Sequence, residues 1–193
     1  MLAMLRSETL IQRAVSNLGF IGQEILVATS NDRTDLGLGS FPNVRLVQDR
    51  ALGRGPLEGI YCGLEASTFQ LNLVVAGDMP FVNKELVNYM FDQVGDFDAV
   101  IPRLRNTLEP LHGIYRKSAK SVAQKLIDSG VFAISRMLGL IRVRYIEEEE
   151  IDHFDPSHLS FFNVNRSEDF KAALLMTTGR GFRRQLPMGT LGQ

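Results

Sequence analysis

The segment 71–81, LNLVVAGDMPF, constrains the fold more than any other part of this sequence. Its apolar residues are adjacent rather than alternating, which is typical of a strand covered on both faces in a mostly parallel sheet. Gly77 permits a turn, and Pro80 prevents the strand from continuing. We therefore expect a central strand that places the carboxylate of Asp78 in the ligand crevice of an open α/β sheet.

Asp78 has two interpretations at this point. A carboxylate at the end of such a strand is a candidate ligand for a hard cation such as Mg²⁺. The alternative is that Asp78 only caps the helix that the sequence suggests over 83–93. The local sequence leaves both interpretations open.

The composition sets the class of protein. With 193 residues, 45% hydrophobic and 22% charged, the chain suits one globular domain with its own core. The formal net charge is -1, so no global field attracts nucleic acid or an acidic membrane. The single Cys62 and three scattered histidines exclude a disulfide framework and a cysteine-based zinc site. Without a signal peptide or a long apolar segment, we expect a cytoplasmic protein.

Strand and helix patterns alternate along the chain, which predicts a single doubly wound α/β fold with a mostly parallel sheet. Strands predicted over 23–30 and 44–48 end at Asn31 and Asp49, just as the later strand ends at Asp78. Because the carboxyl ends of parallel strands meet at one edge of a sheet, we expect these three polar groups to converge. The remaining predicted elements are helices over 1–18, 84–93, 118–128, 131–140 and 167–175, and strands over 99–102, 141–145 and 161–165.

A glycine-rich stretch, GRGPLEGIYCG at 53–63, precedes a helical pattern that runs to about Ser67. Gly55, Pro56 and Gly59 are a candidate nucleotide loop, because a glycine-rich turn into a helix can present backbone N–H groups to an anion or a base edge. The stretch matches neither the P-loop nor the GxGxxG fingerprint. The alternative is a tight turn in which glycines let the helix pack closely.

Two further groups of polar residues have both a functional and a structural interpretation. Glu109 and His112 flank Pro110 closely enough to serve proton transfer, or they are hydrogen-bonded members of a loop. Asn163 and Asn165 lie on one face of the predicted strand 161–165, where they bind a ligand or fix the turn. The four acids at 147–150 predict a solvated turn rather than a metal cluster, since neighbouring side chains cannot all face one ion.

Five segments in this order resemble the molybdenum cofactor guanylyltransferase family. They are the helical segment MLRSETLIQRAVSNL and the motifs RGPLEGIYCGLEA, VVAGDMPF, LEPLHGIY and FFNVNRSEDF, and the resemblance spans nearly all of 1–175. Related cytidylyltransferases are similar in fold but carry a different residue in the place of Met79 and a histidine in the place of Glu109. The sequences GDMP and EPL therefore favour the guanylyl branch.

The resemblance implies a Rossmann-like nucleotidyltransferase fold that uses Mg²⁺ to transfer GMP from GTP to molybdopterin and releases pyrophosphate. By position, Asp78 resembles the catalytic Mg²⁺ ligand. Asn31 and Asp49 resemble residues that contact the guanosine part of GTP. The pterin side of the site would hold Glu109 with His112, and the asparagines Asn163 and Asn165. Partners would be GTP, molybdopterin and, transiently, other molybdenum-cofactor biosynthesis proteins.

The sequence departs from the family at its beginning. Family members start with a strand and a glycine-rich loop, LAGGxSxRMGxxK, that holds the triphosphate, and Leu2 falls where the lysine would be. We therefore expect the first strand to be missing from the sheet, and translation to begin upstream of Met1, which the upstream codons would decide. We expect 1–175 to form an N-terminally incomplete nucleotidyltransferase domain and 176–193 a flexible tail.

Two other functions fit the sequence. The chain could be a non-catalytic nucleotide- or pterin-binding protein that kept one side of the site. It could also be a nucleotidyltransferase with another acceptor, such as a sugar phosphate. Pyrophosphate release from GTP, compared with release from CTP and ATP, separates the three interpretations.

Overall fold

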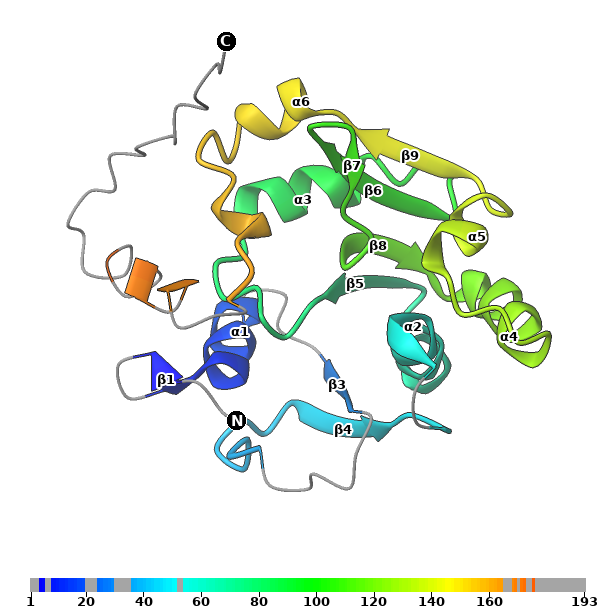
Figure 1. Ribbon diagram of the computed structural model, residues 1–193, viewed down its shortest axis with the longest axis horizontal. Helices are drawn as coiled ribbons and strands as arrows, with labels where there is room; N and C mark the ends of the chain where they lie inside the picture. Colours follow the sequence, from blue (N-terminus) through cyan, green and yellow to red (C-terminus); the bar gives the residue numbers. More distant parts are fainter. Residues whose placement is uncertain are drawn as a thin grey trace, which may run out of the picture.

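The computed structural model describes residues 4–5, 8–19, 24–29, 36–51, 54–164, 168–169, 171–172 and 175. Helices lie against strands throughout this part of the chain (Figure 1). The helices are α1 Leu10–Leu18, α2 Gly55–Ala66, α3 Lys84–Asp92, α4 Lys120–Asp128, α5 Ile134–Leu138 and α6 Glu148–Asp152, with 3₁₀ turns at Lys117–Ala119 and Leu159–Phe161. The strands are β1 Met4–Leu5, β2 Glu8–Thr9, β3 Ile25–Thr29, β4 Val44–Gln48, β5 Leu71–Val75, β6 Ala99–Leu104, β7 Thr107–Leu108, β8 His112–Arg116 and β9 Val143–Ile146.

The main sheet is mixed, with most strands running in one direction. β8 pairs antiparallel with both β5 and β6, and β6 pairs parallel with β9. Strands β5, β6 and β9 therefore share a direction, and β8 runs against them. β3 and β4 form a separate parallel pair. The predicted α/β class with a mostly parallel sheet is confirmed, and no described strand lies hydrogen-bonded between β3 and β5.

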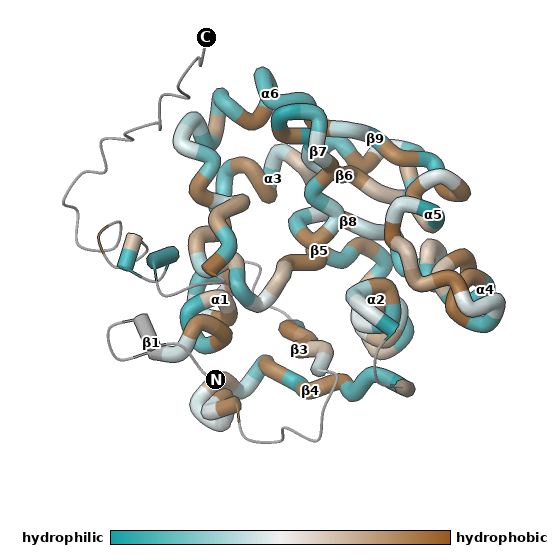
Figure 2. Tube along the Cα trace, in the orientation of Figure 1, coloured by the Kyte–Doolittle hydropathy of each residue, from teal (hydrophilic) through white to brown (hydrophobic). Residues whose placement is uncertain are grey.

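The core lies on both faces of the main sheet. One cluster packs α2, α4 and α5 against residues such as Ile101 and Tyr115, both fully buried. The other packs α3 and α6 against the opposite face, around Val100 and Ile114. Apolar residues also run along β3 and β5 (Figure 2). No helix in the described ranges is long and apolar enough to cross a membrane.

The first helix is shorter than the predicted 1–18. It begins at Leu10, because Thr9 accepts a hydrogen bond from the Gln12 backbone at 3.2 Å and the Gln12 side chain accepts one from the Thr9 backbone at 2.8 Å. This reciprocal capping box fixes a helix start. The short antiparallel pair β1–β2 precedes it instead of further helical turns.

Two predictions near the C-terminus are wrong. The acidic run 147–150, predicted as a solvated turn, instead caps and opens helix α6, where carboxylates near the helix N-terminus are favourable. The described residues of the predicted strand form none, because Phe161 ends a 3₁₀ turn, Leu159–Phe161, and residues 162–164 are irregular. That turn is held by Asp155, which accepts hydrogen bonds from the backbone of Leu159 and Ser160 at 3.1 and 2.8 Å. The side-chain bonds bend the backbone away from a strand.

Strand β5 has the predicted position but less burial than expected. All five of its residues are half-buried, whereas the sequence predicted a strand covered on both faces. The reason is that β5 has a hydrogen-bonded neighbour, β8, along only one of its edges within the described chain. Its other edge faces a cavity, described below.

We predict that Gly113→Ala destabilises the fold by about 1–3 kcal/mol. A Cβ at Gly113 would lie 2.6 Å from Ile101 Cδ1 and 3.2 Å from the carbonyl oxygen of Val100. The control is Gly63→Ala, where an added Cβ meets nothing within 4 Å. That change should stabilise α2 by about 0.5–1 kcal/mol. Urea unfolding monitored by circular dichroism measures both, and equal stability of the two variants would contradict the packing of β8.

Candidate active site

Asp78 lies in a turn at the carboxyl end of β5 that two other segments hold in place. The Ala76 N–H donates to the Leu111 carbonyl at 2.9 Å, which continues the β5–β8 ladder beyond the strand. The Val164 N–H donates to the Asp78 carbonyl at 3.0 Å. The loop before β8 and the segment around Val164 therefore meet at Asp78.

Asp78 does not cap helix α3. The cap is Asn83, whose side chain accepts a hydrogen bond from the Leu86 N–H at 2.9 Å. The half-buried Asp78 carboxylate makes no hydrogen bond or ion pair with the described part of the chain. The capping alternative is thereby removed, and the carboxylate remains available to a ligand.

Glu109 and His112 belong to the same loop but have different environments. The Glu109 N–H donates to the Pro102 carbonyl and the His112 N–H donates to the Glu109 carbonyl, at 2.9 and 3.0 Å. The Glu109 side chain is half-buried, and burial raises the pKa of its carboxyl. It remains a candidate to face a ligand.

His112 is part of the core. Its side chain is fully buried, its ring lies 4.9 Å from that of Phe161, and neither ring nitrogen has a hydrogen-bond partner. Burial lowers the pKa of His112 to about 4, against a smaller opposite effect of the Asp155 charge. The expected place of His112 on the pterin side is not supported, because the buried imidazole has no exposed face for a ligand. The ring instead packs β8 against the 3₁₀ turn.

Asp49 and the candidate nucleotide loop lie together. Asp49, Gly55, Pro56 and Gly59 all line one cavity of about 810 Å³. Gly55 has φ +65° and starts α2, with Pro56 in the first turn and no side-chain cap from Arg54. The N-terminus of α2 therefore opens beside Asp49.

The side chain of Asp49 is poorly solvated. Its Oδ1 atom is buried without a hydrogen-bond partner, and a Cβ at Gly59 would lie 3.9 Å from that atom. Burial raises the pKa of Asp49, and the nearby charge of Glu58 raises it further. A buried oxygen without a partner beside a cavity is able to accept a hydrogen bond from a bound molecule.

Sequence reasoning missed Glu58, the fully buried carboxylate beside Asp49. Glu58 Oε1 accepts hydrogen bonds from the backbone N–H of Arg50 at 3.2 Å and from its Nε at 3.0 Å. Arg54 Nη1 lies 3.6 Å from Glu58 Oε2, and the Arg50 guanidinium stacks 4.0 Å above the Tyr61 ring. The only sequence signal was an acid four residues after Arg54 on the apolar face of a predicted helix.

Some of the remaining predicted site residues lie near the cavity or near Asp78, and others lie outside the described part of the chain. Ala76 and Gly77 line the same cavity as Asp49, and Asp78 is the next residue along the chain. Asn163 is exposed and adjoins Val164, which contacts Asp78. Asn31, Asn165 and the predicted tail 176–193 lie outside the described residues.

The described residues contain no cluster of three or more His, Cys, Asp or Glu side chains that could hold a metal ion. Mg²⁺ does not need such a cluster, because it is often bound by one or two carboxylates together with phosphate oxygens and water. A single free carboxylate at a strand end, as at Asp78, fits that mode of binding.

Comparison with known proteins defines the class. A model of the MobA-like NTP transferase domain matches residues 1–143, and the chain belongs to that family. Its fold and family are those of a nucleotidyltransferase. More particularly, its relatives are molybdenum cofactor guanylyltransferases. A probable one from Pelotomaculum thermopropionicum is 32% identical over 90% of this chain and 84% of its own length. Another from Methanosarcina mazei is 33% identical over 85% and 77%.

Solved structures agree with this placement. Molybdopterin-guanine dinucleotide biosynthesis protein A from Archaeoglobus fulgidus superposes with a TM-score of 0.76 at 27% identity, covering 91% of this chain and 89% of its own. A 2-C-methyl-D-erythritol 4-phosphate cytidylyltransferase from Thermus thermophilus has a TM-score of 0.67 at 17% identity, covering 91% and 92%. The second similarity shows the shared fold alone.

We predict that Glu58→Gln lowers the free energy of unfolding by about 2 kcal/mol, because it weakens charge-assisted hydrogen bonds in a buried site. It should also lower the pKa of Asp49, since the Glu58 charge raises it. The matched control on the same helix is Glu65→Gln, whose exposed partner Lys120 makes an ion pair of little value. Denaturant unfolding and a carboxyl NMR titration measure the two effects. Equal stability of both variants would contradict the buried network.

A second prediction concerns acid stability. The folded-state pKa of His112 lies near 4 and the ordinary value is 6.5, so the unfolded chain binds the proton first. The stability that the neutral imidazole contributes is present above pH 6.5 and is lost as the pH falls towards 4. His112→Phe keeps a ring against Phe161 and removes the titration. Between pH 7 and pH 4 the native chain should lose about 3 kcal/mol more stability than this variant. Parallel loss in both would show that His112 is solvated.

Proposed function

We propose that this chain transfers GMP from GTP to the terminal phosphate of molybdopterin and releases pyrophosphate. The observation that carries the proposal is the position of Asp78. It is a carboxylate without a protein partner in the described chain, at the end of β5, where the loops of Leu111 and Val164 meet. The guanylyltransferases to which the chain is similar, at 32% and 33% identity, support the choice of nucleotide and acceptor.

The reaction transfers the guanylyl group, GMP, from GTP to the acceptor phosphate. A terminal phosphate oxygen of molybdopterin attacks the α-phosphorus of GTP, a new P–O–P bond forms, and the bond from the α-phosphorus to the bridging oxygen breaks. Pyrophosphate carries away the electron pair. The attacking group is already an anion at neutral pH, so the site needs positioning and charge neutralisation more than a general base.

We assign the parts of the site by their surroundings. Asp78 would hold Mg²⁺, which supplies the Lewis acid that neutralises phosphate charge. The unpartnered Oδ1 of Asp49 would accept a hydrogen bond from the guanosine part of GTP beside the N-terminus of α2. Glu109 and the exposed Asn163 would lie on the pterin side, because their segments meet at Asp78.

A second candidate function is nucleotide or pterin binding without transfer. The cavity between β3 and β5 favours this second function. A nucleotide bound beside Asp49 would border this open space and would be held less rigidly than catalysis requires. Catalysis of phosphoryl transfer depends on positioning to within fractions of an ångström, whereas binding tolerates more freedom.

The test mixes the purified chain with GTP, Mg²⁺ and molybdopterin, and measures pyrophosphate release and the dinucleotide product by mass spectrometry. Asp78→Asn should lower the rate by about 100-fold or more, because a metal site supplies several kcal/mol of charge stabilisation. The matched control is Asp96→Asn, an exposed acid before β6 and hence at the opposite end of the parallel strands.

Each outcome decides between the candidates. Product formation that requires Asp78 but not Asp96 supports guanylyl transfer. Binding of GTP or molybdopterin without pyrophosphate release supports the second candidate. A normal rate in Asp78→Asn would remove the metal role, and a strong preference for CTP or ATP would remove the guanylyl assignment.

A further inference from the structure

The loop before β8, residues 109–111, is held at each of its carbonyl groups. The first carbonyl accepts a hydrogen bond from the His112 N–H at 3.0 Å, and the last accepts one from the Ala76 N–H at 2.9 Å. The middle carbonyl accepts one from the hydroxyl of the fully buried Tyr115 at 2.8 Å. Backbone groups that are satisfied within the fold leave a segment little freedom. The side chain of Glu109 therefore extends from a fixed backbone.

The register of β5 and β8 places Glu109 at the same end of the sheet as Asp78. The bond between Ala76 and Leu111 continues the register of the two strands by one position. Asp78 and Glu109 each follow two positions beyond that bond, in the same direction. The Glu109 N–H also donates to the Pro102 carbonyl at 2.9 Å, which fixes the loop to β6. Two carboxylates thus lie at one end of the main sheet.

The Glu109 side chain has no partner in the described part of the chain. It is half-buried and makes no hydrogen bond or ion pair there. Burial alone raises the pKa of Glu109, and no neighbouring charge contributes. A second carboxylate within about 6 Å would raise the pKa further, so Glu109 and Asp78 are not placed to share one ion. Glu109 is therefore a poorly solvated acceptor that the fold itself does not use.

The charge of Glu109 limits which part of a ligand it can contact. Phosphate groups gather around a cation at Asp78, and a carboxylate repels them. A half-buried acceptor without a partner gains most from N–H donors that carry no negative charge. Two adjacent N–H groups on a planar ring match the two oxygens of a carboxylate. Glu109 is therefore suited to the donor edge of a heterocycle.

Aromatic side chains lie at the same end of the sheet. The Phe161 ring lies 4.9 Å from the ring of His112, the first residue of β8. Phe161 and Phe162 are both half-buried, and their segment reaches Asp78 through the Val164 N–H. Planar rings stack favourably on aromatic side chains. These surroundings favour a flat heterocycle as the ligand at this end of the sheet.

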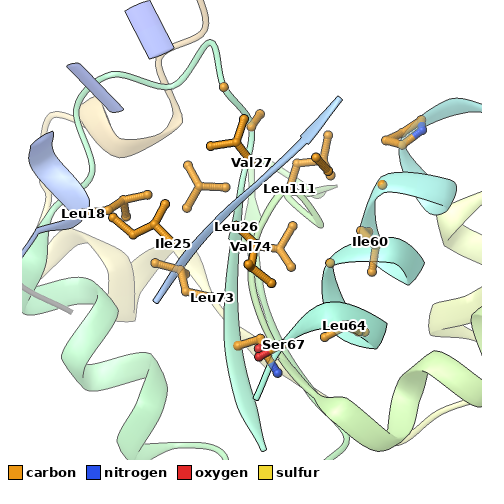
Figure 3. A pocket seen from close by; sticks show the side chains of 18 of the residues that line it. Leu18, Ile25, Leu26, Val27, Ile60, Leu64, Ser67, Leu73, Val74 and Leu111 are labelled. Carbon is orange, nitrogen blue, oxygen red and sulfur yellow. The ribbon is translucent and has the colours of Figure 1, made fainter. Parts of the chain in front are cut away.

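The base of the nucleotide is assigned to a different place. Asp49 lines the cavity of about 810 Å³ together with Leu111, which Figure 3 labels, whereas Glu109 is not part of that lining. The two acids therefore contact different parts of the bound molecules.

We propose that Glu109 selects the acceptor by its heterocycle. Its carboxylate accepts a bidentate pair of hydrogen bonds from the ring N–H and the 2-amino group of a 2-amino-4-oxopyrimidine, the edge that a pterin carries. Guanine carries the same edge, so the experiment below includes both. The identity of the acceptor rests on the proposed function.

The test measures binding of pterin and of lumazine to the full 193-residue chain by the fluorescence of each ring. Lumazine has a carbonyl where pterin has the 2-amino group, so it loses one hydrogen bond to Glu109 and turns an oxygen towards the carboxylate. The native chain should therefore bind pterin about 10- to 100-fold more tightly than lumazine. Equal affinity for the two rings, or a Kd for pterin above about 1 mM, would overturn the proposal.

Variants of Glu109 test the direction of this preference. Glu109→Gln should reverse it, because an amide offers one donor and one acceptor and so matches lumazine. Glu109→Asp keeps the charge and should keep the preference for pterin. The matched control, Glu85→Gln, removes an exposed acid of α3 and should change neither affinity. Circular dichroism confirms that the variants fold. Loss of affinity for both rings by the same factor in Glu109→Gln would show a merely structural role and overturn the proposal.

Two further measurements identify other roles for Glu109. The first compares GTP with ITP, which lacks the 2-amino group of guanine. A changed ratio of these affinities in Glu109→Gln, with the pterin preference unaltered, would assign Glu109 to the guanine. The second measures Mn²⁺ binding, and its loss in Glu109→Gln with the pterin preference unaltered would assign Glu109 to the metal. Either result would overturn the proposal.

Failure of this inference differs from failure of the proposed function. A reversed preference in Glu109→Gln, without pyrophosphate release by the native chain, would support the heterocycle contact and remove guanylyl transfer. Pyrophosphate release by the native chain, with the same pterin preference in Glu109→Gln, would support guanylyl transfer and remove the heterocycle contact.

Discussion

The ladder between β5 and β8 is the interaction on which the candidate active site depends. Five residue pairs set the register of these strands, and the bond from Ala76 to Leu111 extends it to the point where the chain turns. Each backbone hydrogen bond contributes only about 1 kcal/mol net, but together they allow one alignment. A shift by one residue would reverse the faces of β5 and move Asp78 away from the loop of Glu109.

The acidic side chains near the cavity differ in their degree of burial and in their charged neighbours. The Glu58 carboxylate is fully buried and lies against Arg50 and Arg54, and burial and the nearby Glu58 charge raise the pKa of Asp49. Asp78, in contrast, lies where no described protein group competes for it. The acids that follow β4 and β5 thus have different surroundings. One is suited to hydrogen bonding and the other to a cation.

The sequence predicted elements where local pattern and tertiary environment agree. Strand β4 has the predicted bounds, 44–48, and α3 begins at Lys84 as expected. The prediction from sequence failed where one side-chain hydrogen bond sets the backbone conformation. Thr9 does so at the start of α1, and Asp155 does so at the 3₁₀ turn Leu159–Phe161. The burial of His112 and the pairing of Glu58 were not predictable, because both depend on contacts between distant elements. The open edge of β5 was anticipated only through the family resemblance.

The most direct measurement is a crystal structure of the chain soaked with a slowly hydrolysed GTP analogue and Mn²⁺, in which anomalous scattering locates the metal. If Asp78 is the metal ligand, a carboxylate oxygen of this residue lies about 2.1 Å from the ion, which also contacts phosphate oxygens. A metal bound to the analogue with Asp78 turned away from it would contradict the assignment.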